Sequence, residues 1–240
     1  MRMLSCLLLV AALGLPALAQ DSEPPAKPPA DTPKDEPEAE PKAEPKAETL
    51  DETLRRIEAA HKEHKDFAGK FEQIKFIPLT EDEVKSSGRF VFKKPDHVRW
   101  EYEKPSKSIL VVAGDGGQKW SAATGRTEKF KLSEDRGMDA VVKQLFTWFK
   151  GEFTKLKDDY EVSVSSREPL KLTMKPKSEV LRKFINRIEV TFTKDDAEID
   201  SVKLVEPLQP GDELEGYTLY VFKDTALDKG VKESEFEIGK

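Results

Sequence analysis

The sequence predicts a mostly β (α+β) domain, built as a barrel or a strongly curved sheet. Two observations lead to this fold class. Beyond residue 66, apolar residues alternate with polar ones in segment after segment, which is the pattern of half-buried strands. Apolar residues at helical spacing occur in two segments, 49–64 and 139–156. About ten or eleven short strands in so short a chain favour a sheet that curves or closes on itself.

Residues 1–19 are typical of a cleaved secretory signal peptide. Arg2 supplies a positive start, residues 4–15 form an apolar run, and Ala17 and Ala19 give the small-residue cleavage pattern. The run is shorter than the roughly 20 apolar residues of a spanning helix, so an uncleaved anchor is the minor alternative. Cys6, the single cysteine, lies near the beginning of the run and not after it. A lipidated cysteine is therefore rejected, and the mature chain has no disulfide or thiolate.

Residues 20–48 are expected to form a disordered linker rich in Pro, Glu, Lys and Ala. The stretch 21–48 holds eight of the sixteen prolines, nine acidic residues and four lysines, and it has no aromatic residue. Such a segment cannot bury enough apolar surface to offset its chain entropy. It is either an extended spacer or a tolerated tail.

The charge balance argues against a nucleic-acid binder. Without the one arginine of the signal and the charged residues of the linker, the totals of 40 basic and 46 acidic residues become 35 and 37. The net charge of the remainder is then −2, whereas a nucleic-acid-binding domain is strongly basic. Residues 49–240 are long enough for one domain with a sizeable core.

The first half of this domain begins with a helix and continues as strands. Leu50, Leu54, Ile57 and His61 recur at helical spacing and predict a helix over 49–64, which Thr49 or Asp51 caps. Period-two alternation or apolar runs between turn residues then predict strands at 67–73, 88–92, 99–103, 108–112, 118–122 and 127–132. The stretch 108–112 is apolar on both faces.

The second half begins with a helix whose apolar face is wide and aromatic. This helix is predicted over 139–156 and carries Phe146, Trp148, Phe149 and Phe153. The period of two then returns, and it predicts strands at 160–164, 170–174, 185–192, 199–205, 217–222 and 235–238.

Neither a metal site nor an enzyme is indicated. His61 and His64 lie one turn apart on the first helix without a third ligand, so a solvated helix face is expected. His97 is expected to be an ordinary surface residue, and the alternative is that it tunes a closure with pH. The sequence contains no G-x-S-x-G, H-E-x-x-H, phosphate-loop or Rossmann glycine pattern.

Several motifs together resemble one family. The strand Phe67-x-Gly69-x-Phe71-x-Gln73, the stretch SGRFVFKKPDHVRWEY at 87–102, the stretch PSKSILV at 105–111 with Trp120 after it, LKLTMKPK at 170–177 and SEFEI at 234–238 follow one another in order. They resemble the periplasmic outer-membrane lipoprotein carrier protein family (LolA-like) over roughly residues 54–238. The sequence departs from the family pattern at Lys94, where the family has a loop arginine, and in a longer turn at 113–117, so it resembles a divergent member.

The resemblance implies an unclosed antiparallel β-barrel with a central helical lid, located in the periplasm. It implies a monomeric chaperone and carrier, without cofactors and not an enzyme, that moves lipoproteins from an inner-membrane ABC exporter to an outer-membrane acceptor. Acylated lipoproteins or lipids are then its partners. Two alternatives remain open: a carrier of another lipid or glycolipid, and a periplasmic sensor that binds lipoproteins.

Site residues follow from this reading. Lys94 takes the place of the family residue implicated in holding the lid closed. The expected wall of the acyl-chain cavity, including the aromatic residues of the lid, consists of Phe71, Phe90, Phe92, Trp100, Tyr102, Trp120, Phe146, Trp148 and Phe149.

Overall fold

The computed structural model describes residues 48–135, 138–139, 142, 146, 149–196, 198–209, 211 and 213–238. The signal peptide expected at 1–19 lies outside these residues, and so does the linker expected at 20–48, apart from Glu48. Trp148 lies outside them as well.

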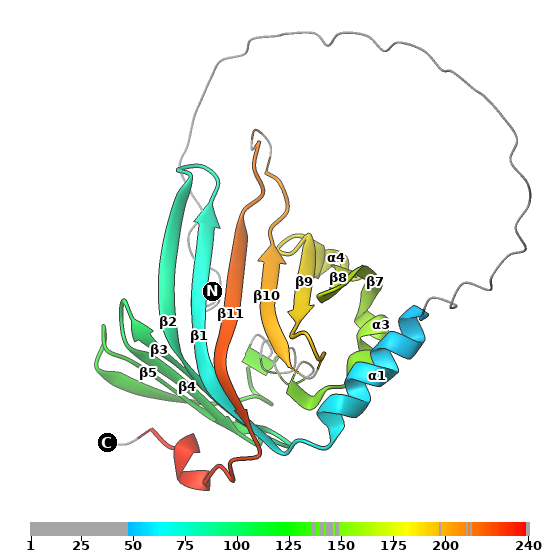
Figure 1. Ribbon diagram of the computed structural model, residues 1–240. Helices are drawn as coiled ribbons and strands as arrows, with labels where there is room; N and C mark the ends of the chain where they lie inside the picture. Colours follow the sequence, from blue (N-terminus) through cyan, green and yellow to red (C-terminus); the bar gives the residue numbers. More distant parts are fainter. Residues whose placement is uncertain are drawn as a thin grey trace, which may run out of the picture. The chain divides into compact units, whose positions relative to one another are not determined.

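A single antiparallel sheet of eleven strands dominates the described residues (Figure 1). Its order is β6-β5-β4-β3-β2-β1-β11-β10-β9-β8-β7. The edge strands β6 and β7 are not paired with each other, so the sheet curves without closing, as the resemblance implied. The strands are β1 (Asp66–Ile77), β2 (Asp82–Lys93), β3 (His97–Lys104), β4 (Ser108–Ala113), β5 (Gly116–Ser121), β6 (Arg126–Lys131), β7 (Tyr160–Arg167), β8 (Leu170–Pro176), β9 (Arg187–Phe192), β10 (Ile199–Val205) and β11 (Tyr217–Leu227).

The first and last strands meet in the middle of the sheet. β1 pairs with β11 from Phe67 opposite Leu227 to Phe76 opposite Tyr217. This pairing, called the β1–β11 seam below, joins two meanders, β1 to β6 and β7 to β11. All other strand neighbours are consecutive in the sequence.

Helix α1 (Leu50–Lys62) precedes the sheet and has a clear start signal. Thr49 and Glu52 form a capping box, in which the Thr49 side chain accepts from the Glu52 N–H and the Glu52 carboxylate accepts from the Thr49 N–H. This resolves the choice between Thr49 and Asp51. The apolar face of α1, with Leu54 and Ile57, is buried.

The central helical region is shorter than the sequence predicted. The described residues 138, 139, 142, 146, 149 and 150 have helical backbone, and Gly151 then takes a φ of +72°. This left-handed conformation ends the helical run. Two short helices follow, η1 (Phe153–Lys155) and α3 (Leu156–Asp159), and α4 (Glu179–Arg182) lies between β8 and β9.

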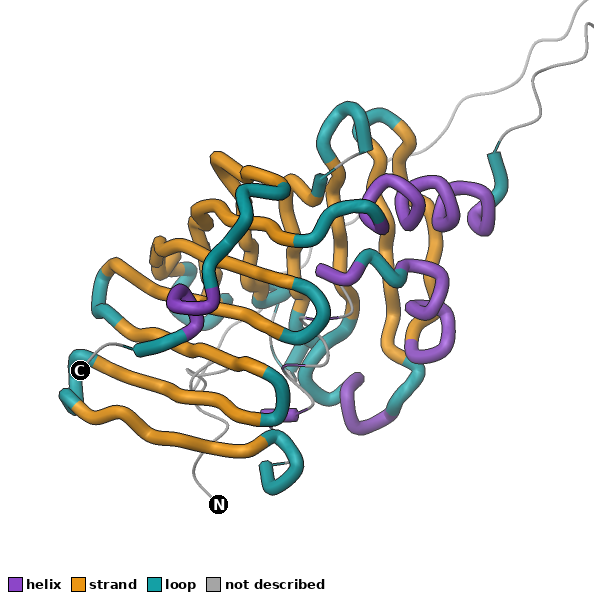
Figure 2. The backbone as a smooth tube through the Cα atoms, turned by 90° about the horizontal axis from the view of Figure 1, so that it is seen from below, coloured by secondary structure: helices purple, strands orange, loops and turns teal. Residues whose placement is uncertain are grey.

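The C-terminal segment is not the strand that the sequence predicted at 235–238. Residues 233–236 form the 3₁₀ helix η2 (Glu233–Phe236), and the segment crosses the strands instead of pairing with an edge (Figure 2). The physical reason lies in Arg99, whose Nη1 donates to the carbonyl oxygens of Glu235 and Glu237 at 3.0 and 3.1 Å. A side chain thus satisfies the backbone groups that a neighbouring strand would otherwise bind.

Two clusters of the core lie on one face of the sheet, called the inner face below. One cluster joins Leu54 and Ile57 of α1, Phe153 and Leu156 to strands β7 to β9. The other lies on β1 to β4 and β11 and is rich in aromatic residues. No helix among the described residues is both long and apolar enough to cross a bilayer.

Candidate functional site

The candidate site is the second of these clusters, called the aromatic cluster. Phe71 lies at its centre and is 1% exposed. Its ring stacks on Trp100 with centroids 4.3 Å apart and meets Tyr102 edge-on at 5.1 Å. The cluster contains Phe67, Phe71, Phe90, Phe92, Val98, Trp100, Val112, Val142, Phe146 and Tyr220, with Tyr102, Leu110, Phe130, Phe149 and Phe222 packed against it.

Two glycines make room for these rings. Gly88 lies opposite Phe71 in the β1–β2 ladder, and Gly69 lies opposite Phe90. A Cβ on Gly88 would lie 1.9 Å from the carbonyl oxygen of Glu101 and 2.9 Å from the Phe71 ring, while one on Gly69 would lie 2.9 Å from the Phe90 ring. Both phenylalanine rings therefore lie flat over a neighbouring backbone, where any larger residue would push them away.

A small polar group is set into this apolar wall. The Tyr102 hydroxyl donates to Oε1 of Gln73 at 2.6 Å. Burial raises the pKa of Tyr220 well above its ordinary value, and the neighbouring Tyr102 hydroxyl adds to this shift. Tyr220 is therefore neutral at physiological pH. This group can form hydrogen bonds with a ligand but carries no charge.

Described residues of the central region cover the aromatic cluster. Phe149 stacks on Phe92 at 5.0 Å and lies 5.8 Å from Phe90. Phe146 lies 5.5 Å from Phe92, and Val142 is completely buried in the same cluster. The aromatic rings of the sheet and the side chains of the covering residues thus pack against one another.

Lys94 connects the sheet to α1. It follows β2, and its Nζ donates to the carbonyl oxygens of His61 at 2.9 Å and Lys62 at 3.2 Å. These carbonyls belong to the last turn of α1, where intrahelical donors are missing. Burial lowers the pKa of Lys94, and three carboxylates around it oppose this effect. The residue named as the lid-closing base therefore holds the C-terminus of α1.

The expectation that His61 lies on a solvated helix face is wrong, because this side chain is 3% exposed. Its Nδ1 lies 2.8 Å from the carbonyl oxygen of Ile57, and because a carbonyl only accepts, Nδ1 carries the proton. The ring meets Phe153 edge-on at 5.1 Å. Burial lowers the pKa of His61 and favours the neutral ring. His97 is half-buried and lies against Phe236.

The structure corrects one predicted wall residue. Trp120 lies opposite Ile109, whereas Trp100 lies opposite Leu110, so the two tryptophans are on opposite faces of the sheet. Trp120 is on the outer face and does not line the aromatic cluster. The other predicted wall residues, apart from the undescribed Trp148, belong to the cluster or pack against it.

The sequence reading missed Phe67, Tyr220 and Phe222. Phe67 shares the alternating pattern of Phe71 and was available as a signal. Tyr220 and Phe222 also alternate, but they reach the site through the β1–β11 seam, which places them opposite Gln73 and Phe71. No local pattern in the sequence predicts the pairing of β1 with β11.

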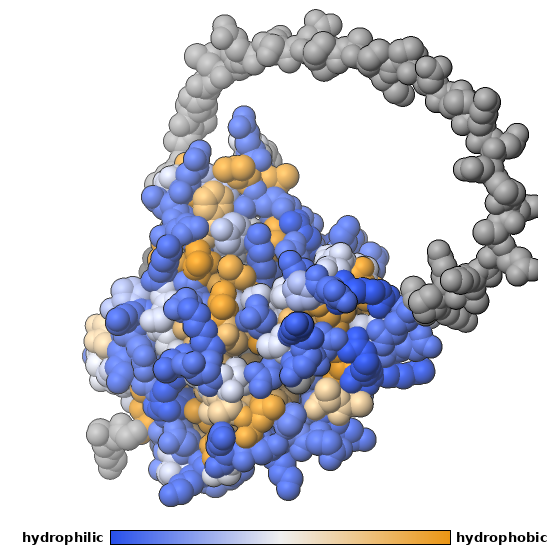
Figure 3. Space-filling model, viewed as in Figure 1, coloured by the Kyte–Doolittle hydropathy of each residue, from blue (hydrophilic) through white to orange (hydrophobic). Residues whose placement is uncertain are grey.

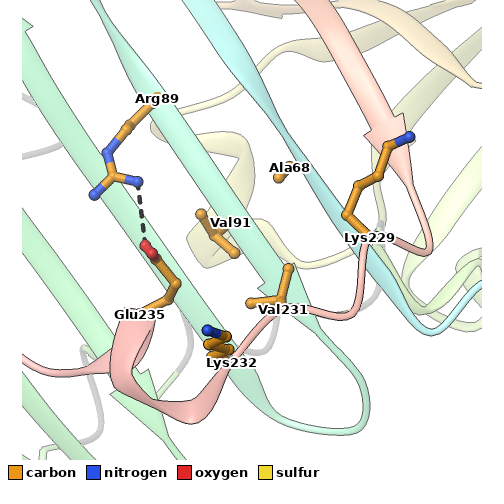
Figure 4. Close-up of a pocket in the computed structure, with 7 residues that line it drawn as sticks. All are labelled: Ala68, Arg89, Val91, Lys229, Val231, Lys232 and Glu235. Carbon is orange, nitrogen blue, oxygen red and sulfur yellow. Dashed lines mark hydrogen bonds and ion pairs between the residues drawn. The ribbon is translucent and has the colours of Figure 1, made fainter.

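The outer face carries a C-terminal strap, defined as residues 228–238. The carboxylate of Asp66 accepts from the N–H groups of Lys229, Gly230 and Val231 at 2.7 to 3.2 Å and fixes the start of the strap. Phe236 packs on Val91 and Val111. A groove of about 250 Å³ lies between the strap and the sheet (Figure 4), lined by Ala68, Arg89, Val91, Lys229, Val231, Lys232 and Glu235.

A buried ion-pair group supports the strap from below. Glu101 is 4% exposed and lies 2.8 Å from Nη2 of Arg99 and 3.0 Å from Nε of Arg89. Arg89 also reaches Glu235 of the strap at 3.2 Å (Figure 4). Burial alone would raise the pKa of Glu101, but the two guanidinium groups outweigh it and hold that pKa below its ordinary value.

In the described ranges, no three His, Cys, Asp or Glu side chains come close enough together to hold a metal ion. The chemistry available at the aromatic cluster is apolar contact with a few neutral hydrogen bonds.

Comparison with known proteins places the chain in a family. The family described as "Outer membrane lipoprotein carrier protein LolA" matches residues 62–238. No curated protein sequence matches the chain significantly.

Three solved structures are similar to this chain at low sequence identity. A putative outer membrane lipoprotein-sorting protein domain from Vibrio parahaemolyticus is 11% identical, with a TM-score of 0.40, and the match covers 77% of this chain and 95% of that one. A LolA superfamily protein from Nitrosomonas europaea is 8% identical, with a TM-score of 0.42 and coverages of 79% and 98%. The MucA/MucB complex of Pseudomonas aeruginosa contains a chain that is 16% identical, with a TM-score of 0.42 and coverages of 78% and 59%.

The family match extends over most of the folded domain, and the open sheet agrees with the fold that the resemblance implied. The chain belongs to the outer membrane lipoprotein carrier protein (LolA) family.

Proposed function

We propose that this protein is a periplasmic carrier that binds the acyl chains of lipoproteins against its aromatic cluster and moves them from the inner to the outer membrane. The observation that carries the proposal is the cluster itself: an aromatic wall on β1 to β4 and β11, covered by Val142, Phe146 and Phe149. Family membership supports a carrier-like role in binding lipids or lipoproteins.

The energetics suit this role. A buried methylene contributes about 0.8 kcal/mol, so a sixteen-carbon chain contributes roughly 12 kcal/mol of gross stabilisation in a membrane. A soluble carrier must offer a comparable apolar surface and must hide it when empty. In this protein the covering rings hide the wall, because Phe149 stacks on Phe92 and contacts Phe90.

Lys94 has a defined part in the proposed cycle. Its bonds to the carbonyls of His61 and Lys62 hold the end of α1 against the β2–β3 turn in the closed form. Loading then involves breaking these bonds as well as the ring contacts. An inner-membrane ABC exporter and an outer-membrane acceptor are the partners that such a cycle requires, since the domain has no energy source of its own.

The experiment that tests the proposal is native mass spectrometry of the mature protein isolated from a Gram-negative periplasm, followed by extraction of whatever is bound. A co-purifying triacylated lipoprotein supports the carrier and identifies the cargo. If a free lipid or glycolipid is bound instead, that lipid and not a lipoprotein is the cargo. A protein that is empty in every preparation, and that takes up no triacylated peptide in solution, contradicts the carrier proposal and favours a sensor.

A further inference from the structure

The large apolar side chains that are strongly exposed are not scattered over the described surface. All of them lie in or beside three connections: β1–β2 (78–81), β8–β9 with α4 (177–186) and β10–β11 (206–216). Their exposed fractions range from 46% to 69%, and they are Leu79, Val84, Val180, Phe184, Leu208 and Leu214. Isolated exposed apolar residues need no explanation, but a concentration of them marks an interaction site.

The three connections lie at one end of the sheet (Figure 1). They follow β1, β8 and β10, and these three strands run in the same direction through the antiparallel sheet. Contacts tie them together. A Cβ on Gly216 would lie 3.3 Å from Pro78, which brings the β10–β11 and β1–β2 connections side by side. Asn186 and Arg187, at the end of the β8–β9 connection, both donate to Glu215 at 2.9 and 2.7 Å. We call this surface the apolar rim.

The space-filling view agrees with this grouping. Apolar residues gather over the upper ends of β1 and β11, and more of them continue down the same face (Figure 3). Near the rim, Phe76 of β1 stacks on Tyr217 of β11 with ring centroids 5.4 Å apart. The rim lies at the end of β2 opposite to Lys94, and therefore away from the contact that holds α1.

The charges around the rim are distributed unevenly. Residues 78–84 contain three acidic and no basic residues, and residues 206–216 contain four acidic and no basic residues. Residues 177–186 contain three basic residues and one acidic residue. Asp82 and Glu213 are exposed beside the apolar side chains of the two acidic connections. An anionic membrane surface would repel this pair of acidic tips, whereas a basic protein surface would attract them.

We propose that the apolar rim is a docking surface for a partner protein whose contact face carries apolar side chains flanked by Lys or Arg. The apolar side chains supply the buried centre of the contact, and the acidic tips at 78–84 and 206–216 orient the partner. The basic α4 connection at 177–186 faces an acidic part of the same partner. This inference stands whether or not the chain carries lipoproteins, because the rim and the aromatic cluster are separate surfaces.

Site-directed photocrosslinking in the native cell tests the proposal on the full chain. A benzoylphenylalanine probe replaces Leu79, Val180 or Leu208 in turn. The matched control position is Thr124, which is exposed in the β5–β6 turn at the same end of the sheet but has no large apolar neighbour in that turn. We expect one protein to be crosslinked from at least two of the three connections and not from Thr124. The crosslinked peptide should contain apolar residues beside Lys or Arg.

Two double variants then separate the possible occupants. Leu79→Ser with Leu208→Ser should weaken binding of the purified crosslinked protein by roughly tenfold or more, with the thermal midpoint unchanged because both residues are exposed. Asp82→Lys with Glu213→Lys should also weaken it, and should make the remaining binding less sensitive to salt.

Three results overturn the proposal. One is the absence of any crosslink specific to the rim. Another is a crosslink only to a second copy of this chain, accompanied by a dimer in sedimentation. The third is cosedimentation of the protein with phosphatidylethanolamine–phosphatidylglycerol vesicles. If the leucine variant loses this binding and the charge-reversed variant strengthens it, the occupant of the rim is a membrane.

Discussion

Replacing Lys94 with methionine tests how firmly the structure is held closed. Methionine keeps most of the length and the apolar stem of lysine but donates no hydrogen bond. The substitution removes the two bonds to the carbonyl oxygens of His61 and Lys62, at 2.9 and 3.2 Å. It also removes a positive charge from the negative end of the α1 dipole.

The expected loss follows from these contacts. Hydrogen bonds to a charged partner contribute about 1.5–3 kcal/mol each when buried, and a charge at a partly buried helix end contributes up to about 2 kcal/mol. Lys94 is only partly buried, and the desolvation that lowers its pKa opposes the gain. Water replaces the lost donor at the exposed side. We therefore expect the free energy of unfolding to fall by about 1–2 kcal/mol.

If the same contacts hold α1 closed, opening becomes easier by the same amount. Stopped-flow uptake of a fluorescent fatty acid should then be roughly tenfold faster in Lys94→Met, since about 1.4 kcal/mol corresponds to a factor of ten. Urea unfolding measures the stability change in parallel. The Lys94→Arg variant should restore both quantities, because its guanidinium still donates to carbonyls.

Lys93→Met is the matched control. Lys93 is the preceding residue, but its ammonium pairs with the exposed carboxylate of Glu233 in the strap. A surface pair of this kind contributes about 0–1 kcal/mol. Equal stabilities and equal uptake rates in the Lys94 and Lys93 variants would refute the reasoning, since they would show that the contacts with α1 do not resist opening.

The remaining predictions concern acid stability, the strap and the aromatic wall. Because burial lowers the pKa of His61, the unfolded chain binds a proton below about pH 6.5 that the folded chain does not, and the free energy of unfolding should fall by up to about 1.4 kcal/mol per pH unit. Urea unfolding at pH 7.5 and 5.5 should show this loss in the native chain and less of it in His61→Leu. Glu101→Gln should cost about 3 kcal/mol in urea unfolding and speed hydrogen exchange at 229–238, because Arg99 loses its buried counter-charge. Trp100→Ala should cost about 3–5 kcal/mol and weaken fatty-acid binding, whereas Trp120→Ala should leave binding unchanged.

Controls for these predictions come from the same elements. A parallel pH dependence in the native chain and in His61→Leu would contradict the assignment to His61. For the strap, Glu103→Gln is the comparison, since Glu103 is exposed at the end of β3. Unchanged exchange in Glu101→Gln would show that the ion-pair group does not hold residues 229–238. Equal effects of the two tryptophan variants on fatty-acid binding would remove the distinction between the two faces of the sheet.

The pH dependence of Glu101 has the same direction as that of His61 but a lower range. The pKa of Glu101 in the folded chain lies below its ordinary value, so its stabilising effect is complete above the unfolded pKa of about 4.5. That effect is lost as the pH falls through the folded pKa. Loss of stability between pH 6.5 and 5 therefore reports on His61 more than on Glu101.

Most strands were predictable because their sequences alternate. The segments around Phe71, Phe90 and Tyr160 show a period of two, and each became a strand with that aromatic side chain on the inner face. Helix α1 was predictable from its spacing and its cap. In these elements the local sequence pattern, the turn residues and the helix cap all favour the structure that the fold adopts.

The face of Trp120 was not predictable by the same means. The stretch from Ile109 to Val112 is apolar at every position, so its pattern does not indicate which side chains lie on the inner face. The structure explains this composition, since Val111 is covered by Phe236 of the strap while Val112 faces the aromatic cluster. Which of two apolar faces points inward depends on a segment that lies more than a hundred residues further along the chain.

His61 and the strap show a second limit. Helical spacing places His61 on the apolar face, but a histidine is acceptable there only because Ile57 offers its carbonyl oxygen to Nδ1. Residues 235–238 look like a strand in the sequence, yet Arg99 binds their carbonyls instead. In both cases a side chain satisfies a polar group across the fold, and periodicity carries no information about such contacts.

The β1–β11 seam also determines when the protein can fold. Phe67 and Leu227 are partners in the ladder although 159 residues separate them in the chain, and among the described residues the seam is the only strand pairing between the two meanders. Closing so long a loop costs chain entropy before any contact repays it, which slows folding. The two halves of the sheet can therefore join only after β11 has emerged, so Tyr220 and Phe222 complete the aromatic wall last.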